Sequence, residues 1–219
     1  NYIWLLQESD ALVIIDPSEA TPVIDWLIAH HVEPTAILIT HTHYDHIGGV
    51  EKLIKHYPNV QVCANMLAQG ITPTHAVQAN EVFQLGDLSV HVVNLSGHTP
   101  DHIGYYVPDH HALFCGDALF SGGCGRLFNG GTAEQMTDSL LRISKFSLDT
   151  NLYPAHEYTL ANMRFAQMVE PDNVDLLERL AEAQNLRKQG AITLPTKLAT
   201  ELAVNPFLRT ELPNIHQAI

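Results

Sequence analysis

Residues 40–49 read Thr-His-Thr-His-Tyr-Asp-His-Ile-Gly-Gly and directly follow the apolar run 36–39, which has the character of a buried strand. Imidazole and carboxylate groups suit zinc, iron and manganese ions in proteins. A strand end that carries so many polar groups is costly to bury without a metal ion. The stretch therefore predicts a metal site with four candidate ligands, which are His41, His43, Asp45 and His46.

The geometry of this stretch follows from the backbone periodicities. Side chains two residues apart lie on the same side of an extended chain, so we expect His41, His43 and Asp45 to converge. His46 then needs a turn, which glycines 48–49 permit, and the apolar spacing of residues 50–57 predicts a helix. The ligands are therefore expected at a strand-to-helix corner.

Apolar runs and helical spacings alternate on both sides of this corner, which favours a sheet layered with helices. Thr132 and Gln135 form a capping box that predicts a helix through about residue 146, and the chain beyond Tyr158 becomes helical. The expected strands are 2–6, 12–15, 36–39, 60–64, 82–85, 88–95, 103–107, 112–115 and 152–155, and the other expected helices are 23–29, 50–57, 160–169 and 174–188.

Three further candidate ligands, His98, Asp117 and His156, each stand just after a predicted strand. Loops held at the end of a rigid sheet commonly carry function. A carboxylate such as Asp117 can bridge two cations, and a water molecule between two ions becomes a nucleophile near neutral pH. We therefore expect two ions and hydrolytic chemistry. On spacing alone, a structural role for these three residues is an equal alternative.

Asp16 ends the predicted strand 12–15 and precedes Pro17. An Asp-Pro pair at a strand end is more often a turn, so we favour that interpretation. The alternative is a carboxylate that orients a ligand imidazole by a hydrogen bond.

Composition restricts the function classes. The chain has 219 residues, 46% of them hydrophobic, and a formal net charge of −13. This charge disfavours nucleic acid and anionic membranes as partners, and an anionic substrate would need a local cationic patch. Three widely spaced cysteines argue against a disulfide framework and fit a reducing cytoplasm, and we expect a cytoplasmic monomer.

Several segments together resemble the metallo-β-lactamase-fold hydrolases, and within them the glyoxalase II family of hydroxyacylglutathione hydrolases. The His-x-His-x-Asp-His element at 41–46 marks the superfamily. The family is indicated by Gly97-His98-Thr99, the segments 116–125 and 155–159, and Asn205-Pro206-Phe207-Leu208-Arg209. The resemblance implies an α/β fold, an αββα sandwich over residues 1–158, followed by a small helical substrate-binding domain over residues 159–219.

The resemblance also implies the ligand sets and the reaction. His41, His43 and His98 would hold one divalent ion, and Asp45, His46 and His156 the other, with Asp117 bridging them. Zinc is the expected metal, with iron or manganese as alternatives. The family hydrolyses S-D-lactoylglutathione to D-lactate and glutathione in methylglyoxal detoxification. Asp45 and Asp117 are the expected catalytic residues, since they hold the ions that share the attacking hydroxide.

Glutathione carries carboxylates, so the family analogy indicates Arg126 and Arg209 as cationic contacts and Tyr158 as a hydrogen-bonding partner. A tyrosine that some relatives carry two residues after the first arginine is replaced by Phe128, and no second basic residue closely follows Arg209. Three alternatives stay open: a mononuclear iron persulfide dioxygenase, another thioesterase of the same fold, and a structural metal-binding module.

Overall fold

The protein, described by a computed structural model over residues 1–213 and 215, divides into two compact units. The first unit holds residues 1–94 and 101–116, and the second holds residues 95–100 and the chain from Asp117 onward. The boundary expected at residue 158 falls inside the second unit and stays a prediction. Residues 214 and 216–219 of the expected C-terminal domain lie outside the described residues.

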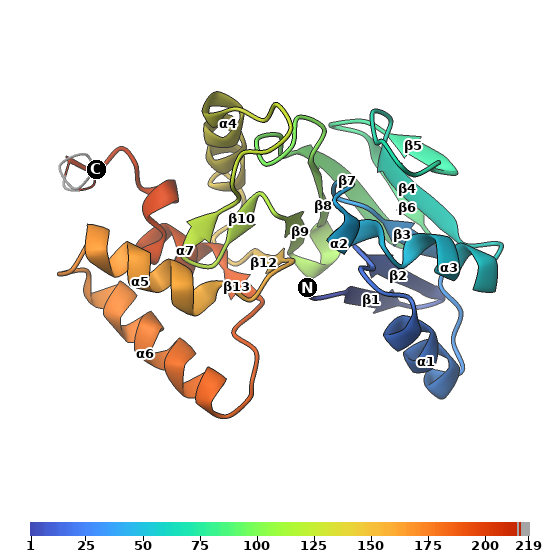
Figure 1. Ribbon diagram of the computed structural model, residues 1–219, viewed down its shortest axis with the longest axis horizontal. Helices are drawn as coiled ribbons and strands as arrows, with labels where there is room; N and C mark the ends of the chain where they lie inside the picture. Colours follow the sequence, from blue (N-terminus) through green and yellow to red (C-terminus); the bar gives the residue numbers. More distant parts are fainter. Residues whose placement is uncertain (214, 216–219) are drawn as a thin grey trace. The chain divides into compact units, whose positions relative to one another are not determined.

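A five-stranded sheet is the centre of the first unit, and it has the strand order β1-β2-β3-β4-β5 (Figure 1). The first two strands pair antiparallel, and the others run parallel. The strands are β1 (Trp4–Glu8), β2 (Ala11–Ile15), β3 (Ala36–Leu38), β4 (Gln61–Asn65) and β5 (His75–Val77), and the helices between them are α1 (Thr21–His30), α2 (Tyr44–Ile47) and α3 (Val50–His56).

Helices α1 and α3 cover one face of this sheet. Ile14, Ile37 and Val62 lie opposite one another on neighbouring strands, and all three belong to the core cluster. Leu27 of α1 and Leu53 of α3 complete the cluster from the helix side. Burial of a large aliphatic side chain contributes about 1.5–3 kcal/mol, so this layer holds β3 firmly in place. The loop that follows β3 therefore starts from a rigid strand.

A second, antiparallel sheet in the same unit contains β6 (Val82–Leu85), β7 (Leu88–Asn94), β8 (Ile103–Val107) and β9 (Ala112–Gly116). The strands expected at 82–85, 88–95, 103–107 and 112–115 are confirmed, and a 3-10 helix, η1 (Pro108–His110), connects β8 to β9. Tyr105 of β8 is fully buried, and its hydroxyl lies 2.9 Å from the carbonyl oxygen of Ile39 and 3.1 Å from that of Cys63. Burial raises the pKa of Tyr105 well above its ordinary value.

The second unit is mainly helical. A buried cluster that includes Met163, Leu176, Leu180 and Val204 packs helices α5, α6 and α7 together. The short strands β12 and β13 pair antiparallel, and β10 and β11 form a small hairpin. The elements of the second unit are β10 (Leu119–Phe120), β11 (Gly123–Cys124), α4 (Ala133–Ile143), β12 (Asn151–Pro154), α5 (Thr159–Val169), α6 (Val174–Lys188), β13 (Thr196–Lys197), α7 (Leu198–Val204) and the 3-10 helix η2 (Pro206–Leu208).

The capping box that begins α4 is confirmed: the Gln135 backbone N–H donates to Thr132 Oγ1, and the Thr132 backbone N–H donates to the Gln135 side chain. The features that were not predicted from the sequence include β5, the β10–β11 hairpin, β13, α7 and the short helix α2. The hairpin was missed because its glycine-rich sequence has no apolar alternation.

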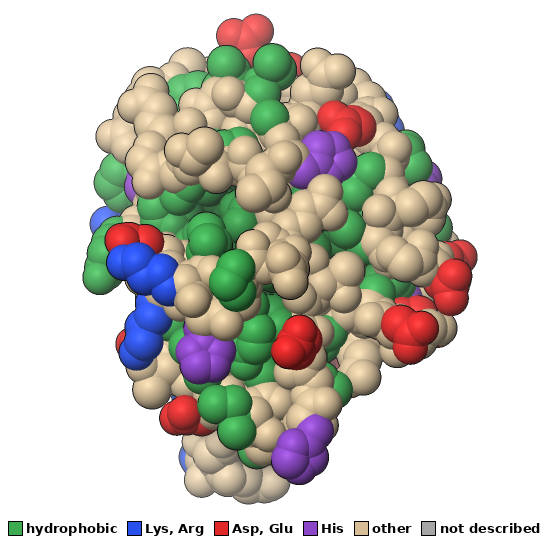
Figure 2. Space-filling model, turned by 90° about the vertical axis from the view of Figure 1, so that its right-hand side faces the viewer, with side chains coloured by type: hydrophobic (Ala, Val, Ile, Leu, Met, Phe, Trp, Pro, Cys, Tyr) green, Lys and Arg blue, Asp and Glu red, His purple; other side chains and the backbone are tan. Residues whose placement is uncertain are grey.

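None of the helices in the described residues is long and apolar enough to cross a membrane. On the face drawn in Figure 2, the Asp and Glu side chains are dispersed over the surface rather than gathered into one patch. The three cysteines are thiols, so the expected absence of a disulfide framework agrees with the structure.

Candidate metal centre

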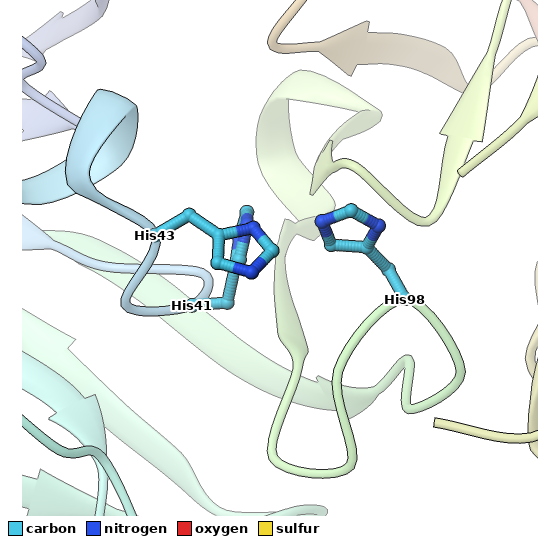
Figure 3. A group of neighbouring side chains, drawn as sticks. All are labelled: His41, His43 and His98. Atoms are coloured by element: carbon cyan, nitrogen blue, oxygen red, sulfur yellow. The ribbon is translucent and has the colours of Figure 1, made fainter. Parts of the chain in front are cut away.

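The loop after β3 brings its four candidate ligands together. His41 Nε2 lies 3.0 Å from His43 Nδ1, and both side chains project from this loop (Figure 3). The short helix α2 begins directly afterwards and presents Asp45 and His46, with the His46 Nε2 3.9 Å from the Asp45 carboxylate. The His41 and His46 rings are also adjacent, with centroids 4.0 Å apart. The structure thus brings His41, His43 and His46 together and places Asp45 beside His46, and α2 turns the chain earlier than expected.

The buried Asp16 carboxylate orients this cluster through hydrogen bonds to Thr40 and His46. Its Oδ1 accepts a hydrogen bond from the Thr40 backbone N–H (2.8 Å), and its Oδ2 accepts from Thr40 Oγ1 (2.6 Å) and from His46 Nδ1 (2.9 Å). A carboxylate that accepts from Nδ1 fixes the imidazole tautomer and leaves Nε2 as the electron-pair donor. The favoured interpretation of Asp16 as only a turn residue was therefore wrong. The orienting carboxylate, its alternative, is what the structure contains.

Gly48 and Gly49 were expected to supply the backbone freedom for a turn, but in the structure they allow a close approach of two backbone segments. Both have ordinary right-handed helical backbone angles, so neither position needs the conformational freedom of glycine. Instead, a Cβ at Gly48 would lie 2.6 Å from the Ser18 carbonyl oxygen, and one at Gly49 would lie 2.6 Å from the Glu19 carbonyl carbon. The missing side chains allow the helix start to approach the segment that follows Asp16.

His102 also belongs to this cluster, although it was not among the candidate ligands predicted from the sequence. It is 1% exposed, and its ring stacks on His41 with centroids 4.8 Å apart and planes inclined by 27°. A Cβ at Gly116, where φ is +51°, would lie 2.8 Å from His102 Nε2. The available signal was the position of this histidine four residues after His98 in Gly-His-Thr-Pro-Asp-His.

The second unit contains the other three candidate ligands as a compact cluster of its own. Asp117 Oδ2 lies 3.6 Å from His98 Nε2, and Asp117 Oδ1 lies 3.3 Å from His156 Nε2. All three side chains are buried. His98 projects from the loop after β7 (Figure 3), and His156 follows β12. The structure therefore supports a shared site for these residues in preference to three separate structural roles.

His98 and His156 are both held in defined orientations. The His98 Nδ1 donates to the Arg126 carbonyl oxygen at 2.7 Å, which leaves Nε2 facing Asp117 as an electron-pair donor. The His156 ring stacks on Tyr158 with centroids 4.7 Å apart and planes inclined by only 4°, and Phe120 contacts both rings edge-on.

These donor sets fit divalent metal ions. His46 and His98, whose Nδ1 atoms each face a carboxylate or carbonyl oxygen, both turn Nε2 toward a carboxylate of their cluster. Two imidazole nitrogens bound to one tetrahedral zinc ion lie roughly 3.3 Å apart, given zinc–nitrogen distances of about 2.0–2.1 Å. The 3.0 Å between His41 Nε2 and His43 Nδ1 is close to that separation.

The three substrate-binding candidates occupy different environments in the second unit. The Arg126 side chain is exposed and borders a pocket of about 300 Å³ whose walls include Met136, Leu140 and Phe207. Tyr158 is half-exposed beside His156. Arg209 instead pairs with the Glu170 carboxylate at 3.0 Å and donates to the Ala203 carbonyl oxygen. Roles for Arg126, Tyr158 and Arg209 in substrate binding stay predictions.

Family models account for the whole chain. Residues 1–156 match the model described as the metallo-beta-lactamase superfamily, and residues 157–219 match the one described as the hydroxyacylglutathione hydrolase C-terminus.

Curated relatives agree with these models. Proteins named hydroxyacylglutathione hydrolase from Aliivibrio fischeri and Vibrio cholerae are 44% and 46% identical over 220 residues, which cover 100% of this chain and 86% of each relative. A protein of the same name from Aeromonas salmonicida is 44% identical over 98% of this chain and 84% of its own length.

Solved structures support the fold. The BLEG-1 B3 metallo-beta-lactamase superposes with a TM-score of 0.72 at 22% identity, covering 94% of this chain and 93% of that chain. A di-iron-bound form of TTHA1623 gives 0.70 at 22% identity with the same coverage. The expected metallo-β-lactamase fold with mixed sheets and a small helical C-terminal domain is confirmed. The chain belongs to the hydroxyacylglutathione hydrolase family of the metallo-β-lactamase superfamily.

Proposed function

We propose that this chain hydrolyses the thioester of S-D-lactoylglutathione and releases D-lactate and glutathione, as a step of methylglyoxal detoxification. The observation that carries this proposal is the 44–46% identity, over the full chain, to proteins named hydroxyacylglutathione hydrolase. The matching C-terminal family model over residues 157–219 favours the hydrolase over the persulfide dioxygenase, the other thioesterases and the structural metal-binding module.

Membership of the superfamily and the His and Asp clusters indicate binding of two metal ions. For the first ion we propose the ligands His41, His43 and His98, and zinc as the metal. The ligands proposed for the second ion are Asp45, His46 and His156. Asp117 would lie between the two ions, a role supported by its carboxylate oxygens facing His98 and His156 separately.

Two bound ions supply a water molecule of lowered pKa and a polarised thioester carbonyl. The chain's own residues supply orientation. Asp16 keeps the His46 proton on Nδ1, and the Arg126 carbonyl oxygen keeps the His98 proton on Nδ1. A leaving thiol with a pKa of about 8.5 departs as a thiolate without protonation, so the reaction needs no dedicated protein acid.

For the glutathione part of the substrate we propose Arg126, Tyr158 and Arg209. The exposed guanidinium of Arg126 suits a substrate carboxylate in a chain of net charge −13. The Arg209 guanidinium lies 3.0 Å from the Glu170 carboxylate, so Arg209 would have to bind the substrate while it also neutralises Glu170. Arg209→Ala should raise KM more than it lowers kcat, and an unchanged KM would assign this residue to the ion pair alone.

We further propose that the protein acts as a cytoplasmic monomer on a small molecule, without a nucleic acid or membrane partner. The net charge of −13 and the three thiols support this proposal.

The test pairs elemental analysis with a thioester assay on S-D-lactoylglutathione. We expect about two metal ions per chain and hydrolysis that is lost on removing them by chelation. Asp117→Ala and His98→Ala should abolish hydrolysis with the fold kept, whereas His56→Ala, an exposed histidine on α3, should behave as wild type. Full activity in either ligand variant would refute the proposed site.

A further inference from the structure

Glu201 is a carboxylate without any exposed surface, on helix α7 in the second unit. A buried carboxylate is costly unless hydrogen bonds satisfy it. Two donors serve each oxygen here. Ser121 Oγ and Thr196 Oγ1 donate to Oε1 at 2.7 and 2.8 Å, and the Gly122 backbone N–H and Asn205 Nδ2 donate to Oε2 at 2.8 and 3.2 Å.

Two of these four donors belong to the β10–β11 hairpin, about eighty residues earlier in the chain. Asn205 is also fully buried, and the same Nδ2 lies 3.1 Å from the Phe120 carbonyl oxygen and 3.0 Å from that of Gly123, so its two N–H groups are shared among three acceptors. Gly122 at the hairpin turn has φ of +71°. The tip of the hairpin is therefore held by the Glu201 carboxylate and the Asn205 carboxamide, together with Asn162 Nδ2, which donates to the Ser121 carbonyl oxygen at 3.1 Å.

The two ends of this hairpin contact candidate metal ligands. Asp117 lies two residues before the start of β10, and Arg126, whose carbonyl oxygen orients His98, lies two residues after the end of β11. Gly125 is packed so closely that a Cβ there would lie 1.9 Å from the Asp117 carbonyl oxygen and 3.1 Å from His98 Nδ1. A displacement of the hairpin would therefore also displace Asp117 and His98, because the backbone at Gly125 packs against both.

We propose that Glu201 is a positioning residue for the metal centre: by fixing the β10–β11 hairpin, it sets the orientation of Asp117 and His98 and thereby the metal affinity. The Glu201 carboxylate bonds Ser121, Gly122, Thr196 and Asn205 rather than either ligand, so its effect on the ligands passes through Ser121 and Gly122. The inference rests on the proposed function for the identity of the metal ligands.

A pair of hydroxyl donors provides the sharpest test, because Ser121 and Thr196 bond the same carboxylate oxygen at nearly the same distance. Ser121 lies on the hairpin, whereas Thr196 lies on β13. Ser121→Ala and Thr196→Val each remove one bond to Oε1. Zinc affinity of the metal-free full chain is measured by competition with a chelator, and the melting temperature is measured in parallel.

We expect both variants to melt at a lower temperature, and only Ser121→Ala to bind zinc more weakly, by about tenfold, as for other groups that orient metal ligands. Its kcat should fall with KM nearly unchanged. Equal zinc affinities in the two variants, whether unchanged or equally lowered, would overturn the proposal.

Glu201→Gln extends the test, because its amide places a donor against groups that already donate. We expect a loss of zinc affinity at least as large as for Ser121→Ala. Asn173→Ala is the destabilising control, since its side chain caps α6 and donates to the Ala203 carbonyl oxygen of α7, so the change removes bonds of the second unit other than those to the hairpin. If this control weakens zinc binding as much as Glu201→Gln does, general destabilisation explains both and the proposal fails. Zinc affinity is measured without substrate, so a wild-type protein inactive on the thioester would refute the proposed function alone.

Discussion

Replacement of Asp16 by asparagine tests whether the carboxylate beneath the His-rich loop controls metal binding. Asp16 Oδ2 accepts from His46 Nδ1 at 2.9 Å and from Thr40 Oγ1 at 2.6 Å. If the new amide oxygen keeps the bond to the Thr40 backbone N–H, the amide nitrogen faces His46 Nδ1. His46 must then move its proton to Nε2, which removes the electron pair that would bind the metal.

The expected magnitude follows from this tautomer change. Groups that orient a metal ligand typically contribute 10–100-fold in affinity, which corresponds to roughly 1.4–2.7 kcal/mol. We expect Asp16→Asn to weaken the second metal site by this factor and the first site by less, because His46 is proposed as a ligand of the second ion.

The assay is a zinc titration against a chelating competitor at fixed pH, accompanied by thermal unfolding of the metal-free chain. Asp25→Asn, an exposed residue of α1, is the matched control and should bind zinc as the wild type does. A wild-type affinity in Asp16→Asn, with the protein folded, would refute the orienting role and return Asp16 to a purely structural one.

Three other predictions concern stability. Gly49→Ala should lower the free energy of unfolding by about 1–3 kcal/mol in urea titrations, because its Cβ would lie 2.8 Å from the Pro17 carbonyl oxygen, and an unchanged value would contradict the close packing. Thr132→Ala should cost about 1 kcal/mol through the lost α4 cap, and a loss below a few tenths would mean that the cap is dispensable. Burial raises the pKa of Cys63 and Cys124 to about 12, so the folded state retains protons that the unfolded state releases above its ordinary thiol pKa. Stability should therefore fall as pH rises from about 8.5 toward 12, by up to about 1.4 kcal/mol per pH unit for each thiol, and Cys63→Ala should reduce that slope.

The candidate metal ligands could be recognised in the sequence because metal binding depends on donor groups, which composition and spacing reveal directly. His41, His43, Asp45 and His46 stand within six residues, so local backbone geometry alone brings them near one another. The structure confirms this local cluster. Local sequence patterns did not predict the role of Asp16. They favour a turn at this residue, and only the fold brings its carboxylate to His46, thirty residues later.

The glycines show the same division. Gly48 and Gly49 were recognisable as special, but local propensity suggests backbone freedom, whereas the structure uses the absence of a Cβ. Close approach between distant segments is a property of packing and leaves no local signal. His102 was also overlooked, since a lone histidine is more often structural than part of a site, and only its ring stacking on His41 identifies it.

By itself, the sequence predicted a metal site, the alternation of strands and helices, and the family, because donor groups, apolar periodicity and motifs are local features of a sequence. Only the tertiary structure decided which groups support those ligands. Asp16 beneath His46, the Arg126 carbonyl behind His98, and Glu201 behind the β10–β11 hairpin are joined to their partners by hydrogen bonds across 28 to 80 residues of chain. Such bonds depend on where the packed core places each backbone segment, and no periodicity or composition encodes that placement.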